Sequence, residues 1–134
     1  MNNKELYAPQ YCACFMGCSP IWLPNKGDIT QPAMSLLFQH TKAQVKSAIR
    51  NGKLYFFNGG TAGYNIVAAE AVIELRQEYP QIKLISLLSF DLGHANDWTD
   101  KWPYRALHVY DNSDQCIQLS TGYYPGVYFD HYEW

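Results

Sequence analysis

Residues 54–79 read LYFFNGGTAGYNIVAAEAVIELRQEY, and this stretch decides the fold of the chain. Its first five residues form a short apolar run, which is typical of a buried strand in a parallel sheet. The glycines at positions 59, 60 and 63 then predict a turn, because glycine adopts backbone conformations that other residues avoid. From Gly63 to Tyr79 apolar residues recur at helical spacing, and Pro80 ends the pattern. A strand, a glycine turn and a helix in succession indicate half of a β-α-β unit.

Similar patterns lie on both sides of this unit. The strands are expected at Tyr11–Met16, 54–58, Lys83–Phe90 and Cys116–Leu119, and the helices at Ala33–Arg50, Gly63–Tyr79 and Trp98–Asp111. Strands that alternate with helical crossovers form right-handed parallel units, with helices on both faces of the sheet. We therefore predict one domain over residues 1–134, a small Rossmann-like three-layer α/β domain with a parallel sheet of about four strands.

The composition narrows the classes of partner. Only 16% of the 134 residues are charged, against about 25% in an ordinary domain, while eleven Tyr, six Phe and four Trp supply many rings. Few charges and many rings indicate a surface buried against a ligand or a subunit, so we expect a homo-oligomer. The net charge of −2 argues against a protein that holds nucleic acid by bulk electrostatics.

Neither a membrane span nor a secretion signal is visible in the chain. No run approaches the roughly 20 apolar residues of a membrane span, and the polar start MNNKE does not resemble a signal peptide. We therefore expect a cytoplasmic protein without a membrane partner.

The four cysteines do not form a recognisable framework. Cys12, Cys14 and Cys18 lie within seven residues of one another and Cys116 lies far away, which is not a disulfide pattern. A metal site would need a further ligand from elsewhere, and no base stands near Cys18 to activate it as a nucleophile. We expect no metal, no cofactor and no catalytic residue here.

The candidate ligand site is expected at the carboxyl ends of the strands, where open α/β sheets bind their ligands. This rule brings together the segments Gly17–Pro20, Asn58–Asn65, Ser89–Asp91 and Ser120–Tyr124. Backbone N–H groups at the start of a helix favour an anion such as a phosphate. The candidate ligand-binding residues are Gly17, Cys18, Ser19, Asn58, Gly59, Gly60, Thr61, Gly63, Asn65, Glu70 and Asp91.

Each group of candidates has an alternative role. The glycines would offer N–H groups to a phosphate, although similar glycines also form plain tight turns. Asn58, Asn65 and Glu70 would hydrogen-bond a ribose or a base, but the two asparagines could instead satisfy the loop backbone. Glu70 and Asp91 could also be solvated surface acids. The turn lacks both the full G-x-G-x-x-G spacing and the G-x-x-x-x-G-K-[ST] sequence of a Walker loop.

Four motifs in order carry a resemblance to a known family. They are CACFMGCSP at 12–20, FNGGTAGYN at 57–65 followed by AAE at 68–70, the strand at 83–90 with Trp98 and Arg105 after it, and YYPG at 123–126. Together they resemble the YpsA-like family of the SLOG superfamily. The resemblance implies a Rossmann-like fold that binds nucleotides, nucleotide derivatives or nucleic acid. Several superfamily members act as ligand sensors in conflicts between bacteria and phages.

The departures from the family pattern favour binding over catalysis. Cys18 and Ser19 stand where the family has His-Arg, so a cation for an anionic ligand is missing, and Asn58 and Asn65 replace a serine and an aspartate. The P-G-G-x-G-T-x-x-E motif on which hydrolysis by the related LOG enzymes depends is absent. We therefore predict non-catalytic sensing or sequestration of a nucleotide-derived small molecule, such as a defence signal in phage–bacterial conflict.

Two alternatives stay open from the sequence. The first is a LOG-type hydrolase that cleaves an N-glycosidic or phosphate-ester bond of a nucleotide, with Glu70 or Asp91 as its base. The second is an oligomeric interaction protein whose glycine turn is a relic. In that case the aromatic tail at 123–134, which holds six rings, would be the working surface.

Overall fold

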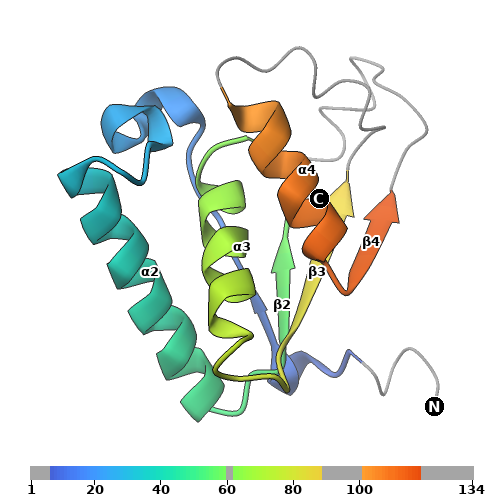
Figure 1. Ribbon diagram of the computed structural model, residues 1–134. Coiled ribbons are helices and arrows are strands. Elements are labelled where there is room, and N and C mark those ends of the chain that lie inside the picture. Colours follow the sequence, from blue (N-terminus) through green and yellow to red (C-terminus); the bar gives the residue numbers. More distant parts are fainter. Residues whose placement is uncertain (1–6, 60–61, 89–100, 119–134) are drawn as a thin grey trace.

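Four parallel strands form one sheet, in the order in which they occur along the chain (Figure 1). The computed structural model describes residues 7–59, 62–88 and 101–118. Each strand pairs in parallel with the next, and the strands are β1 (Cys12–Cys14), β2 (Tyr55–Asn58), β3 (Lys83–Leu88) and β4 (Gln115–Gln118). The predicted α/β domain with a four-stranded parallel sheet is confirmed.

The three connecting helices lie on one face of this sheet. They are α2 (Pro32–Arg50), α3 (Tyr64–Leu75) and α4 (Trp102–Asn112). Because the strand order follows the chain order, right-handed crossovers carry every connection over the same face, as Figure 1 shows. The second helical layer that a three-layer arrangement implies is not among the residues that the structure describes.

Helix α3 is the centre of the core. It packs against α2, α4, β2 and β3, and its buried residues are Ile66, Val67, Ala68, Ala69, Ala71, Val72 and Leu75. A helix with a sheet beneath it and a helix on each side is buried around most of its circumference. The helical spacing of apolar residues in the sequence predicts one buried face, whereas the structure buries more of the helix surface than that face. The helix also ends at Leu75 and not at Tyr79, although the N–H of Tyr79 still donates to the Leu75 carbonyl at 2.8 Å.

Helices α2 and α4 each have a proline in their first turn. Pro32 and Pro103 each occupy the first turn of their helix, where a missing N–H costs nothing. The buried face of α2 carries Met34, Phe38, Thr41 and Val45, and Leu37 is half-buried. Within the described ranges, no helix combines the length and the apolar character that a membrane crossing requires.

The sheet face opposite the helices carries aromatic side chains. Phe56 and Asn58 of β2 are buried, so the alternate residues Tyr55 and Phe57 point to the other side. The Tyr7 ring packs edge-on against both of them, with centroids 5.4 Å from Tyr55 and 5.6 Å from Phe57. Its hydroxyl donates to the side-chain oxygen of Gln115 on β4. Tyr7 therefore covers part of this face across more than one strand.

Candidate functional site

The segment that follows β1 lies directly against the start of α3. The backbone N–H of Tyr64 donates to the carbonyl oxygen of Cys18 at 3.0 Å. A Cβ atom added to Gly63 would lie 2.3 Å from that oxygen and 3.0 Å from the Ser19 Cα. The structure thus brings Cys18 and Ser19 beside the glycine turn, as the rule for the carboxyl ends of strands predicts.

Two glycines allow this close packing. Gly63 has φ 111° and ψ −145°, a backbone region that is essentially restricted to glycine. A Cβ atom on Gly17 would lie 2.4 Å from the Tyr64 ring, which packs directly over that glycine. The Tyr64 hydroxyl is in turn hydrogen-bonded to buried Thr41 at 2.8 Å. The first N–H of α3 is used within the protein, so an anion would depend on the other amides of the turn.

The two predicted asparagines differ in their surroundings. Asn58 is only 2% exposed, and its side-chain N–H donates to the Ser86 hydroxyl at 2.9 Å. The Ser86 hydroxyl is 2.7 Å from that of Ser113, which donates to a carbonyl of α4. Asn58 therefore belongs to a buried hydrogen-bond chain beneath α4. The Asn65 side chain lies at the turn itself, since a Cβ atom on Gly59 would be 3.2 Å from its Nδ2.

The buried chain makes Ser86 important for stability. We expect Ser86→Ala to lower the free energy of unfolding by about 1–3 kcal/mol, because the Asn58 side-chain N–H loses its acceptor in the core. Ser47→Ala, on an exposed position of α2, should change it by less than about 0.5 kcal/mol. Urea unfolding followed by circular dichroism measures both values. Equal midpoints for the two variants would show that the buried chain contributes little.

Glu70 forms an ion pair with Arg105 of α4. Arg105 donates from Nη2 to Oε1 at 2.5 Å and from Nε to Oε2 at 3.0 Å, so both carboxylate oxygens are engaged. The two side chains are 17% and 18% exposed. This geometry gives Glu70 a structural role between α3 and α4, and its low exposure differs from that of a solvated surface acid.

Arg105 also holds the loop between β1 and α2. Its Nη1 donates to the carbonyl oxygen of Gly27 at 2.7 Å, and its guanidinium lies 4.3 Å from the centre of the Trp102 ring. Gly27 has φ 86°, and a Cβ atom there would lie 2.6 Å from the Trp102 ring. The sequence resemblance includes both Arg105 and Glu70, but it does not show that the two side chains pair. A separation of 35 residues along the chain hides this pairing from a local reading of the sequence.

Burial makes the thiols of Cys12 and Cys116 less reactive. The half-buried Cys12 thiol points to the Ala8 carbonyl at 3.4 Å, and burial together with the neighbouring Cys14 raises its pKa. Burial also raises the pKa of Cys116. A raised pKa lowers the fraction of the nucleophilic thiolate at neutral pH. Within the described part of the chain, no three His, Cys, Asp or Glu side chains are grouped as a metal site.

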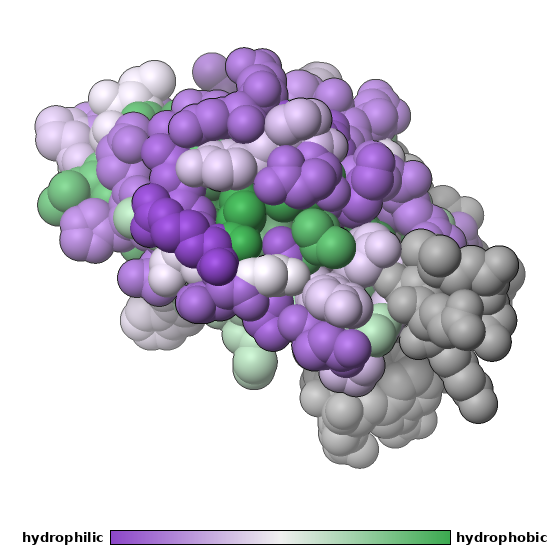
Figure 2. Space-filling model, turned by 90° about the horizontal axis from the view of Figure 1, so that it is seen from below, coloured by the Kyte–Doolittle hydropathy of each residue, from purple (hydrophilic) through white to green (hydrophobic). Residues whose placement is uncertain are grey.

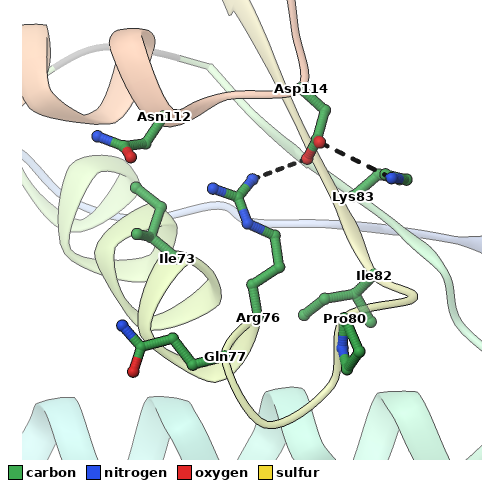
Figure 3. Close-up of a pocket in the computed structure, with 8 residues that line it drawn as sticks. All are labelled: Ile73, Arg76, Gln77, Pro80, Ile82, Lys83, Asn112 and Asp114. Atoms are coloured by element: carbon green, nitrogen blue, oxygen red, sulfur yellow. Dashed lines mark hydrogen bonds and ion pairs between the residues drawn. The ribbon is translucent and has the colours of Figure 1, made fainter.

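A hollow of about 380 Å³ lies at the opposite end of the sheet. Figure 2 views this end and shows an apolar area surrounded by hydrophilic residues. In Figure 3, Arg76 and Lys83 point toward Asp114, at 2.8 Å and 3.9 Å, between the end of α3 and the starts of β3 and β4. Asp114 also accepts the backbone N–H of Leu84 at 2.8 Å. The described lining includes none of the predicted site residues, and these contacts join the strand starts to α3.

Some predicted residues lie outside the part of the chain that the structure describes. These are Gly60, Thr61 and Asp91, together with the rest of the expected segments 89–91 and 120–124. The described part of the site therefore consists of Gly17 to Ser19, Gly59, Gly63 and Asn65, with Asn58 beneath it.

Comparison with known proteins confirms the family resemblance of the sequence. A family model for YpsA, described as "YspA SLOG family", matches residues 28–133. The chain belongs to the YpsA family. It is also 28% identical over 97 residues to UPF0398 proteins from two strains of Staphylococcus epidermidis, a match that covers 72% of this chain and 51% of each relative. The chain thus spans about half the length of these relatives. The region matched by the YpsA family model includes the glycine turn, α3, and both partners of the Glu70–Arg105 ion pair.

Proposed function

We propose that this member of the YpsA family binds a nucleotide-derived small molecule at the glycine turn and does not convert it. The observation that carries the proposal is the contact of Cys18 and Ser19 with the start of α3. It places two loops, an exposed serine and a helix N-terminus at the carboxyl ends of parallel strands. Ligands of open α/β sheets bind at this edge.

The site would attract an anion without a charged side chain. Residues 14–22 and 62–69, which form its described walls, contain no Lys, Arg, Asp or Glu. Attraction for a phosphate would come from backbone amides and from the dipole of α3, which places partial positive charge at its first turn. Amide groups such as that of Asn65 would add hydrogen bonds to a ribose or a base.

The described acids favour binding over hydrolysis. Glu70, one of the two bases of the hydrolase alternative, has both oxygens engaged by Arg105. A general base must reach the proton that it abstracts, and this pairing turns Glu70 toward α4. Sensing or sequestration of the ligand is the function that this arrangement supports, and the family resemblance suggests a setting in phage–bacterial conflict.

Calorimetry with ADP-ribose, NAD and 3′,5′-cyclic AMP tests the proposal. We expect saturable heat with at least one of them. Ser19→Glu should weaken that binding about tenfold, because a carboxylate beside the helix start repels the phosphate. Ser19→Gln, which has the same size without the charge, should weaken it by less than about threefold.

Two further measurements complete this experiment. Gln77→Ala, at the opposite end of the sheet, should leave the affinity unchanged. Chromatography should return the bound nucleotide intact, whereas a product would establish the hydrolase alternative. No heat with any of the three nucleotides, or equal effects of Ser19→Glu and Ser19→Gln, would overturn the proposal.

A further inference from the structure

Three large apolar side chains stand in solvent on the loop between β1 and α2. Met16 is 91% exposed, Ile21 75% and Trp22 74%. Single exposed apolar residues are ordinary. Three of them within seven residues, beside a candidate ligand site, indicate a binding surface.

The loop that carries them is fixed to the core at several points. The N–H of Phe15 donates to the Phe57 carbonyl at 3.1 Å, and the Cys18 carbonyl accepts the N–H of Tyr64. Leu23 is buried, and the Gly27 carbonyl accepts a hydrogen bond from Arg105. The exposed side chains therefore project from a backbone that the core holds in place.

Trp22 lies in the turn that follows the segment packed against the start of α3. Its N–H donates to the Ser19 carbonyl at 3.1 Å within the short 3-10 turn η2 (Pro20–Trp22). Ser19 precedes this turn with an extended backbone, and its Cα would lie 3.0 Å from a Cβ atom on Gly63. The exposed Trp22 is therefore three residues from the contact with the start of α3. Figure 1 shows this turn at the same end of the sheet as the start of α3.

We propose that Trp22 is the platform on which the base of the bound nucleotide stacks. This inference rests on the proposed function and specifies its ligand as a nucleotide that carries a base, not a sugar phosphate alone. Stacking on an aromatic ring contributes to affinity for any base, because every base has a π-face. In a site whose described walls contain no charged side chain, stacking supplies affinity that a cation would otherwise provide.

Intrinsic fluorescence tests this role. The chain has four tryptophans, so the Trp22 signal is the difference between the wild type and Trp22→Phe. We expect the nucleotide that gives heat among ADP-ribose, NAD and 3′,5′-cyclic AMP to quench this signal, and ribose 5-phosphate to leave it unchanged. Trp22→Ala should weaken nucleotide binding about tenfold, and Trp22→Phe by less than about threefold, because phenylalanine keeps a ring.

The outcomes separate this inference from the function on which it rests. If Trp22→Ala binds the nucleotide as the wild type does, or if ribose 5-phosphate binds as tightly, the stacking role is wrong and the binding function stands. If no nucleotide binds the wild type, both are wrong. Light scattering that shows a lower mass for Trp22→Ala, with unchanged affinity, would instead make this surface an interface between copies. Because Trp22 is 74% exposed, both variants should melt at the wild-type temperature.

Discussion

Gly63→Ala is expected to lower the free energy of unfolding by about 2–4 kcal/mol. The φ and ψ of Gly63 lie in a region that costs other residues about 1–3 kcal/mol. The added methyl group would also lie 2.3 Å from the Cys18 carbonyl oxygen, which is backbone and cannot rotate away. Relief of that clash would break the hydrogen bond from the Tyr64 N–H, at a cost of about 1 kcal/mol.

Thermal unfolding measures this effect against a matched variant. Gly52 also has a positive φ, 90°, but a Cβ atom there would meet nothing within 4 Å. Gly52→Ala should therefore cost only the backbone strain of about 1–2 kcal/mol. We expect Gly63→Ala to melt about 10–20 °C below the wild type, and Gly52→Ala a few degrees below. Similar melting temperatures for the two variants would show that the Cys18 backbone moves away from the added methyl group at little cost in free energy.

The Glu70–Arg105 ion pair should give the second large effect. We expect Glu70→Met and Arg105→Met each to lower the free energy of unfolding by about 2–4 kcal/mol, because each leaves one mostly buried charge without its partner. The double variant removes both charges, so its loss should be smaller than the sum. Urea unfolding of the four proteins should give a coupling energy of about 1–3 kcal/mol.

An exposed ion pair provides the control for this cycle. Lys42 and Glu74 form an ion pair at 2.8 Å, but the Glu74 side chain is 54% exposed. Glu74→Met should therefore cost less than about 1 kcal/mol. A coupling energy near zero for Glu70 and Arg105 would contradict the structural role. If Glu70→Met lost nucleotide binding but kept its stability, Glu70 would be a ligand-binding residue and not a structural one.

The predictions about secondary structure succeeded where the local pattern was strong. The stretch 54–79 places a strand, a turn and a helix within a few residues of their observed bounds, and the strand at residue 83 begins as expected. The ends of elements were less accurate: α3 stops at Leu75, and β1 is limited to Cys12–Cys14. Strand and helix ends depend on hydrogen bonds to other segments, which a local pattern does not contain.

The position of the candidate site could be predicted from the sequence, but the roles of its residues could be predicted only in part. The sequence predicted that Cys18 and Ser19 lie beside the glycine turn, because the carboxyl ends of parallel strands share one edge of the sheet. It could not show that the first N–H of α3 donates to the Cys18 carbonyl. Nor could it show that Asn58 and Glu70 have buried partners, since those partners, Ser86 and Arg105, are 28 and 35 residues away.

The sequence by itself determined the alternation of strands and helices, the parallel sheet and the edge at which two loops meet. These follow from apolar periodicity and from glycine and proline, which act over a few residues. Only the tertiary structure decided that the three described helices share one face and that Arg105 joins Glu70 to Gly27. It also left Trp22 exposed in the turn that follows the contact of Ser19 with Gly63. Such contacts arise when the whole chain packs, because the neighbours of a side chain are then set by the strand order and not by the adjacent sequence.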